Sequence, residues 1–341
     1  MPNKILLDKI RQIRKGIDLH DIKYDIALTN FSVAYKNQMP YIADKAFPVV
    51  PVNRRQGTYW NWSKEDFLRN RGKKWTPGEP LPTGQFDVDH TPTYNCEYRA
   101  FSENMRWDLI DEGDSSLQIE QSSAEFVTEA LLLNRELEFV DGFFKTGIWA
   151  VDQTGVASAP AANQFIQWSD YDNSDPIYDI KARKRVIKGR CGMKPNTGIF
   201  SDEVMDVLVD HPLLIERYKY TSEGIVTNDM IAKVLGLDKI FVGGALQVTS
   251  AEGAATTTLG EIFGKNAWIG YVNPSPKLKS MSAGYTFAYT GVGKNIGSGY
   301  DVAVRRISDE ETMVDKAQAI MCYTQKVVDA TAGTFFSGAV A

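Results

Sequence analysis

Few residues in this sequence have the types and spacing that catalysis or metal binding requires. The chain has 3 histidines, His20, His90 and His211, and no two of them have the spacing of a metal-binding pair. Asp87, Asp89 and His90 form a D-x-D-H cluster that could hold a cation. On a strand, however, residues 87 and 89 share one face while residue 90 points to the other. We therefore interpret the cluster as a solvated polar segment and predict no metal site.

Other catalytic signatures are incomplete. The stretch GVGKNIGSG at 291–299 lacks the G-x-x-x-x-G-K-[ST] order of a phosphate loop, and no helix pattern follows it, so it predicts a turn between strands. The carboxylates show no acid–base pair, and there is no G-x-S-x-G motif. Cys96, Cys191 and Cys322 are far apart and without CxxC spacing, which is typical of buried small side chains. We predict a protein that is not an enzyme and that has no cofactor.

A basic segment with interleaved aromatic residues is the clearest candidate for binding. Its cations alternate with Trp60, Trp62, Phe67 and Trp75, a pattern that can bind single-stranded nucleic acid. Acidic residues in the same segment favour ion pairs between subunits instead, and a solvated surface remains an alternative. The residues that we expect at inter-subunit contacts here are Arg54, Arg55, Arg69, Arg71, Lys73, Lys74 and Trp75.

The elements around this segment predict a long hairpin. Residues 57–62 and 85–101 have strand patterns, the second with Tyr94, Cys96, Tyr98 and Ala100 on one face. The charged, Pro- and Gly-rich connection between them has no apolar stripe to form a core. Because an isolated two-stranded hairpin is marginally stable in water, we expect it to rest on another subunit.

A long amphipathic helix is predicted at 117–145, after the N-capping residues 114–116. Glu120 and Glu129 lie on its polar face, where a basic segment of a neighbouring copy could bind. Arg135 is also expected off the apolar stripe. The side chains expected on that stripe are Ile119, Phe126, Ala130, Leu133, Leu137, Val140 and Phe144.

The rest of the chain has a mixed α/β pattern. Helices are predicted from Pro176 to Gly189 or Gly192, after Ser201, and around 227–237, with short strands between them. Residues 149–175 read as a loop, and the residues Arg183 to Arg185 with Lys188 as a solvated face. A long strand is expected near 315–328, with Ala317, Ala319, Met321 and Tyr323 on one face.

Composition is that of an ordinary globular protein. The 341 residues carry a net charge of −5, so the surface as a whole does not attract nucleic acid. No apolar run reaches the length of a membrane helix, and the polar N-terminus is unlike a secretory signal, so we expect intracellular synthesis and no membrane partner. Residues 1–30 have a partly helical amphipathic pattern, and we expect this arm to pack on the body or on a neighbouring chain.

The order of these elements resembles the major capsid protein of tailed bacteriophages with the HK97-type fold. The runs NTGIFSDEVMDVLVDHPLLIERYKY and SAGYTFAYTG are also similar to parts of capsid sequences. The resemblance implies an α+β fold with an N-terminal arm, an extended E-loop, a spine helix in a P-domain, and a mixed α/β A-domain. The implied boundaries are an arm at 1–45, a first P-domain strand at 46–55, the E-loop at 56–97, P-domain with spine helix at 98–149, A-domain at 150–295, P-domain return strands at 296–328, and a tail into the A-domain at 329–341.

The same resemblance implies a structural function. The expected protein self-assembles into the hexamers and pentamers of an icosahedral head that encloses phage double-stranded DNA, with which it makes loose contact. Its expected partners are a portal and a separate scaffolding protein, and its location is the virion after synthesis in the host cytoplasm. No motif identifies a cross-linking Lys–Asn pair. Two alternatives are an encapsulin-type nanocompartment shell and a soluble α+β enzyme with an unmarked site.

Overall fold

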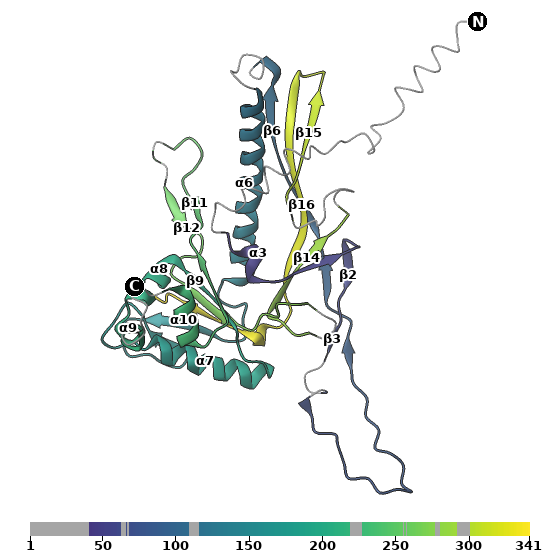
Figure 1. Cartoon of the computed structure of the whole chain (residues 1–341), viewed down its shortest axis with the longest axis vertical. Coiled ribbons are helices and arrows are strands. Elements are labelled where there is room, and N and C mark those ends of the chain that lie inside the picture. Colours follow the sequence, from purple (N-terminus) through teal and green to yellow (C-terminus); the bar gives the residue numbers. More distant parts are fainter. Residues whose placement is uncertain are drawn as a thin grey trace, which may run out of the picture. The chain divides into compact units, whose positions relative to one another are not determined.

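The computed structural model describes residues 41–62, 66, 68–108, 116–218, 227–254, 256, 258–276, 280–291 and 301–341. The arm expected at 1–30 and the Gly-rich turn at 292–299 lie outside these ranges. The chain forms two compact units (Figure 1). The described part of unit 1 falls within Tyr98–Leu131 and Val292–Met321, and that of unit 2 within Met39–Glu97, Leu132–Gly291 and Cys322–Ala341. In the described part of the chain, no helix has the length and apolar character to span a membrane.

Unit 1 contains most of β6 (Glu97–Arg106), the first half of helix α6 (Ser116–Phe143), β15 (Ala303–Asp309) and the first half of β16 (Val314–Val327). β15 pairs antiparallel with β16 from Ala303 opposite Ile320 to Asp309 opposite Val314. The alternation expected in β16 is confirmed, because Ala317, Ala319, Met321 and Tyr323 are fully buried. From Lys316 to Met321 these buried side chains alternate with half-exposed ones, as a strand with one buried face requires, while Cys322 on the other face is also buried.

Helix α6 forms where the sequence predicts it, but it buries a different face. Phe126, assigned to the apolar stripe, is 54% exposed. The stripe prediction is wrong because α6 buries polar side chains that the pattern placed toward solvent. At about 100° per residue, the centre of the buried face lies roughly 180° from the centre of the predicted stripe. The positions that are buried are Ser123, Ala124, Val127, Thr128, Leu131, Leu132, Arg135, Glu136, Phe139 and Phe143.

Unit 2 contains a six-stranded sheet of order β10-β9-β13-β17-β7-β8. β13 is antiparallel to both of its neighbours, and the remaining pairs are parallel. β7 and β8 arise from the segment that the sequence analysis read as a loop, so that reading is corrected. The strands, in sheet order, are Lys239–Gly243, Thr197–Ser201, Ala267–Gly270, Gly333–Ser337, Asp152–Val156 and Gln164–Ile166.

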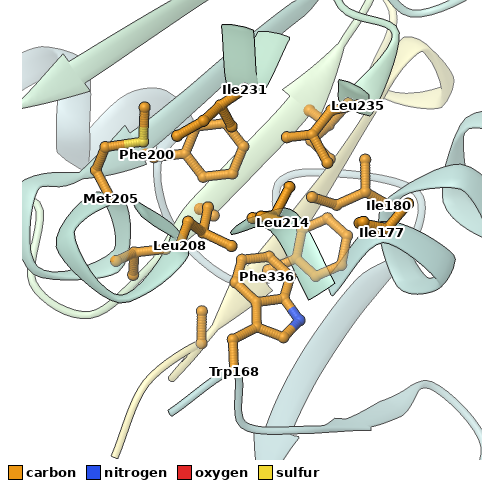
Figure 2. Close-up of a cluster of buried hydrophobic side chains, with 14 of the residues drawn as sticks. Trp168, Ile177, Ile180, Phe200, Met205, Leu208, Leu214, Ile231, Leu235 and Phe336 are labelled. Atoms are coloured by element: carbon orange, nitrogen blue, oxygen red, sulfur yellow. The ribbon is translucent and has the colours of Figure 1, made fainter. Parts of the chain in front are cut away.

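Helices cover one face of this sheet. The strand register places Phe200, Ala267 and Phe336 side by side on that face, where they join one core with Ile180, Leu208 and other helical side chains (Figure 2). Two of the expected caps are present: the Ser201 hydroxyl accepts from the Val204 amide, and Gly192 ends its helix at φ +78°. The N-cap expected before α6 lies outside the described residues. The helices are α7 (Pro176–Cys191), α8 (Asp202–Asp210), α9 (Pro212–Tyr218) and α10 (Asn228–Leu235).

The other face of the sheet packs against aromatic side chains from the end of α6 and its flanking segments. Trp268 and Phe335 are paired on this face. Trp268 contacts Phe47 at a ring distance of 5.7 Å and Trp149 at 5.0 Å, and Phe335 contacts Phe144 at 5.1 Å. Phe47 directly follows the short helix α3 (Ala43–Ala46), so this aromatic layer joins α3, α6 and the sheet.

The expected hairpin is present, in a more broken form. β2 (Gln56–Thr58) pairs with β5 (Thr93–Asn95), and β3 (Asn61–Trp62) pairs with β4 (Val88–Asp89). The long strand expected at 85–101 is instead divided among β4, β5 and β6. The prediction that Cys96 and Tyr98 share one face of a strand is wrong, because the strand is interrupted at Cys96, between β5 and β6. Cys96 is buried, whereas Tyr98 is 47% exposed. Before the hairpin, β1 (Val49–Val52) pairs with β14 (Gly284–Tyr289), which pairs in turn with β16.

Candidate assembly interface

The connection between β3 and β4 is a long exposed segment. Every residue from 68 to 87 is exposed, and no strand is assigned among them. Three large apolar side chains in it are more than half exposed: Leu68 at 72%, Leu81 at 69% and Phe86 at 58%. A segment of this length that buries none of its apolar side chains has no core of its own, and such surfaces are typical of protein–protein contacts.

Two of the residues expected at inter-subunit contacts have partners inside this segment. Arg71 forms an ion pair with Asp66 and donates to the carbonyl of Gln85. The indole of Trp75 donates to the carbonyl of Glu79 at 2.7 Å. The Asp87 amide, which donates to Asp66 at 2.8 Å, and the Arg71 guanidinium hold the pKa of the Asp66 carboxyl below its ordinary value. Arg71 and Asp66 thus tie the two sides of the segment together.

The remaining expected cations, Arg54, Arg55, Arg69, Lys73 and Lys74, are exposed. They belong to the base and to the connecting segment of the hairpin. The Arg55 side chain donates to the carbonyl of Cys96 at 3.4 Å.

The base of the hairpin is fixed by aromatic stacking. Tyr94 stacks on Phe287 of β14 with ring centroids 4.8 Å apart, and Tyr59 stacks on the same ring at 5.5 Å. Gly57 lies directly opposite Tyr94, where an added Cβ would come within 2.6 Å of the Tyr94 hydroxyl. The hairpin therefore leaves β1 and β14 from a rigid, packed base.

The D-x-D-H cluster engages local groups. The Asp89 carboxylate accepts from the Thr91 amide at 2.8 Å, and the Asp87 carboxylate accepts from the Val88 amide at 2.9 Å. The His90 ring contacts Trp60 edge to face. Within the ranges that the structure describes, no three His, Cys, Asp or Glu side chains gather as a metal site requires.

Glu120 and Glu129, which we expected to bind a basic segment of a neighbouring copy, differ in their surroundings. Glu120 pairs with Arg306, which also pairs with Asp315, so Glu120 belongs to an ion-pair network within unit 1. Glu129 is half-buried. Because Glu120 is already neutralised by a cation of its own chain, it presents a weaker anionic surface than its sequence position indicates.

A buried pair of charged residues on α6 was missed by the sequence analysis. Arg135 and Glu136 are both fully buried. The two Glu136 carboxylate oxygens accept from the amides of Ile42 and Ala43 at 3.0 and 2.9 Å, at the start of α3, and Arg135 lies 4.0 Å from Asp44. Burial raises the pKa of Glu136 to about 7 against the opposing effect of both amides and Arg135. Their only signal in the sequence is a helical spacing of four residues from positions 131 and 132 and of eight from positions 127 and 128, which are also buried.

The position of Lys184 also differs from the one that the sequence predicted. It was grouped with a solvated basic face, but it is buried, and its ammonium donates to the carbonyls of Leu235, at 2.8 Å, and Gly236 at the end of α10. Burial lowers its pKa to about 8. The ammonium has a structural role, because it caps the last carbonyls of α10 and joins α10 to α7.

His211 is buried as well, but its geometry does not form a catalytic pair. Its Nδ1 accepts from the Leu213 amide at 3.3 Å, so its Nε2 carries the proton and donates to Ser174 at 3.1 Å. A ring nitrogen that donates to the serine hydroxyl cannot also take its proton. The Ser174–His211 contact therefore connects two loops and activates no nucleophile.

Comparisons with known proteins agree with the resemblance predicted from the sequence. A family model described as phage major capsid protein E matches residues 161–268. The chain is 27% identical over 259 residues to the major capsid protein of Burkholderia phage BcepMu, across 73% of this chain and 76% of that protein.

Solved structures show a related fold. A phage-related protein from Bordetella bronchiseptica RB50 is similar with a TM-score of 0.68 and 24% identity, over 93% of this chain and 98% of that chain. The capsid structure of cyanophage P-SCSP1u is similar with a TM-score of 0.52 and 7% identity, over 96% of this chain and 93% of that chain. These structural likenesses concern the fold alone. Together with the sequence matches, they confirm the resemblance to phage major capsid proteins.

Proposed function

We infer that this chain is a phage major capsid protein, a structural subunit that builds the shell of the virion by associating with copies of itself. The observation that carries this inference is the similarity to a phage major capsid protein over 73% of the chain. The geometry supports it, because the exposed segment 68–87 buries no apolar core within the subunit. The named relative favours a phage shell over a nanocompartment shell or a soluble enzyme.

The finer assignment of the elements follows from the family resemblance. We assign the hairpin within 56–97 as an E-loop that lies over the P-domain of an adjacent subunit, and α6 as the spine helix. The segment 1–45 is the N-terminal arm, and the six-stranded sheet with its helices is the main part of the A-domain. Each contact of this kind is modest, and a stable shell results because every subunit makes several of them at once.

The implied partners are other copies of the chain in hexamers and pentamers, a portal, and a separate scaffolding protein. Packaged double-stranded DNA makes loose contact with the inner surface, which is consistent with the net charge of −5. The role is structural and non-enzymatic, and the subunit reaches the virion after synthesis in the host cytoplasm.

Replacement of residues 64–84 by a short Gly-Ser linker tests the E-loop assignment. We expect a soluble, folded subunit with wild-type circular dichroism, because residues 68–84 add no buried side chains to the core. Particles should be lost in sedimentation velocity, since the contact with the adjacent subunit is removed. A variant that still builds normal shells would show that this segment is not an assembly element.

A further inference from the structure

A two-stranded ribbon in unit 2 exposes an apolar face. β11 (Leu246–Val248) and β12 (Leu259–Glu261) pair antiparallel, with Leu246 opposite Glu261 and Val248 opposite Leu259. Directly opposed residues share a face, so all four side chains lie on the same side of the ribbon. Leu246, Val248 and Leu259 are 49%, 57% and 60% exposed. A ribbon of two strands with an uncovered apolar face is marginal in water, so this face requires a partner.

The ribbon begins beside a cluster of acidic side chains on α8. Asp202, Glu203 and Asp206 are exposed, and a Cβ added to Gly244, two residues before β11, would lie 3.6 Å from the Asp202 carboxyl carbon. Burial raises the pKa of Glu261 most, and the charges of Glu203, Asp202 and Asp206 raise it further. Lys265 acts on Glu261 in the opposite direction, and its ammonium also donates to the carbonyl of Ala341. Four carboxylates and one ammonium therefore lie near the start of the ribbon, which gives this end of the apolar ribbon an excess of negative charge.

Helix α7 presents a surface of complementary chemistry. Tyr178, Lys181, Arg185 and Lys188 are spaced by three, four and three residues and form one stripe along the helix. Tyr178 is 63% exposed, Arg185 and Lys188 are exposed, and Lys181 is half-buried. Across the described ranges of the chain, no ion pair joins these three cations to a carboxylate. Long basic side chains can cover apolar surface with their methylene stems while their charged ends reach acidic groups.

We propose that the β11–β12 face of one copy docks on the α7 stripe of a second copy. Leu246, Val248 and Leu259 pack against Tyr178 and the stems of the α7 cations, while the ammonium and guanidinium groups pair with the carboxylates of α8 and Glu261. This proposal rests on the proposed function, because it assigns one contact between shell subunits. The two surfaces differ, so the contact is head-to-tail, and in a closed shell its repetition would run around a ring of subunits.

A charge exchange tests this contact. We expect Arg185→Glu with Lys188→Glu to lower the assembled fraction about tenfold, because like charges then oppose each other across the contact. Glu203→Lys with Asp206→Lys should have the same effect. The chain with all four substitutions restores the attraction with its sign reversed and should assemble to at least about half the wild-type extent. Glu216→Lys, an exposed charge change on α9, is the matched control and should assemble normally.

Sedimentation velocity gives the assembled fraction, and thermal melting confirms that each variant folds. Reversals that leave wild-type assembly intact, or a fourfold variant that is folded but unassembled, would overturn the contact while the proposed function stands. A loss confined to the α7 reversal would also overturn it, since α7 would then meet another partner such as DNA. If the wild-type chain forms no particle even with scaffolding protein supplied, the proposed function fails, and this contact fails with it.

A disulfide-trapping measurement gives an independent answer if a reversed variant does not fold. We expect the chain with Val248→Cys and Arg185→Cys to form disulfide-linked ladders under mild oxidation in assembled particles. Each single variant should stay monomeric on a denaturing gel, because Cys96, Cys191 and Cys322 are buried. Particles of the double variant that yield no ladder would contradict the proposed contact.

Discussion

At the scale of single residues, two buried charges determine how distant segments meet. The Glu136 carboxylate accepts from two amides at the start of α3, those of Ile42 and Ala43, and this packs the start of α3 against α6. The Lys184 ammonium binds the carbonyls at the end of α10. In each case a charged group satisfies backbone groups that a helix end leaves without partners, so neither charge is available for chemistry.

Glu136 gives the subunit a defined pH dependence. Its pKa is raised from 4.5 to about 7 in the folded state, so between these values the folded state holds a proton that the unfolded chain has released. Its contribution to stability is therefore fully present below pH 4.5 and is lost as the pH rises through about 7, by about 3 kcal/mol. Glu136→Gln should reduce the fall in stability between pH 4.5 and about 7. The melting temperature of the unassembled subunit, measured across this pH range, gives the slope.

The matched control for this measurement is Glu125→Gln on the same helix, which should keep the wild-type slope. An unchanged slope in Glu136→Gln would show that another group carries the pH dependence. A steeper slope would contradict the assigned direction of the pKa change.

Lys184→Met tests the second buried charge. The substitution retains the apolar stem but leaves two carbonyls without their donor, and we expect a loss of about 1–3 kcal/mol in the free energy of unfolding. Lys188→Met, at an exposed position of the same helix, should change it by less than about 0.5 kcal/mol. Equal effects of the two substitutions in denaturant titrations would show that Lys184 makes no net contribution through these bonds.

At the scale of elements, the orientation of α6 is the main finding that differs from expectation. Its buried face follows the positions 124, 127, 131, 135 and 139, and Phe126 lies outside it, in edge contact with Phe101. Phe139 is fully buried, at 5.5 Å from Phe47 and 5.3 Å from Phe143. The helix thus anchors the aromatic layer beneath the six-stranded sheet.

Two phenylalanine substitutions on this helix measure its orientation. Phe139→Ala should destabilise the subunit by about 3–5 kcal/mol, because it leaves a cavity in a packed aromatic layer. Phe126→Ala should cost less than about 1 kcal/mol, because more than half of that side chain is exposed in the subunit. If denaturant unfolding shows a larger loss of stability for Phe126→Ala than for Phe139→Ala, the buried face of α6 is the stripe that the sequence predicted.

The sequence predicted where helices and strands lie better than it predicted which of their faces are buried. Local signals were sufficient for α7, which begins at Pro176 and ends at Gly192, for the Ser201 cap, and for the alternation of β16. The face of α6 was not predictable, since Arg135 and Glu136 are buried by partners more than ninety residues away in the sequence. The same holds for Lys184, whose carbonyl partners belong to another helix. β7 and β8 were read as a loop because short strands of small and polar residues carry little pattern of their own.

The candidate contact residues were predicted only in part. The exposed cations of the hairpin were identified from composition, but the pairing of Arg71 with Asp66 and of Glu120 with Arg306 depends on tertiary structure. The apolar face of the β11–β12 ribbon was also missed, because its strands are only three residues long and lie within a Gly-, Ala- and Thr-rich stretch.

At the scale of the whole molecule, the account depends on contacts that a single chain cannot satisfy alone. The segment 68–87 and the ribbon face both expose apolar side chains beside charged ones. We expect neighbouring copies to cover these surfaces in a shell. The subunit is therefore expected to be soluble at low concentration and to assemble cooperatively above a threshold, since every added copy makes several contacts at once.

Electron microscopy of the purified full chain tests the central claim most directly. With the separate scaffolding protein supplied where it is required, we predict closed particles of uniform diameter whose reconstruction shows rings of six and five subunits. The hairpin of each subunit should lie over an adjacent copy. If only monomers or small rings appear at every concentration and salt condition, with and without scaffolding protein, the assignment as a capsid subunit is contradicted.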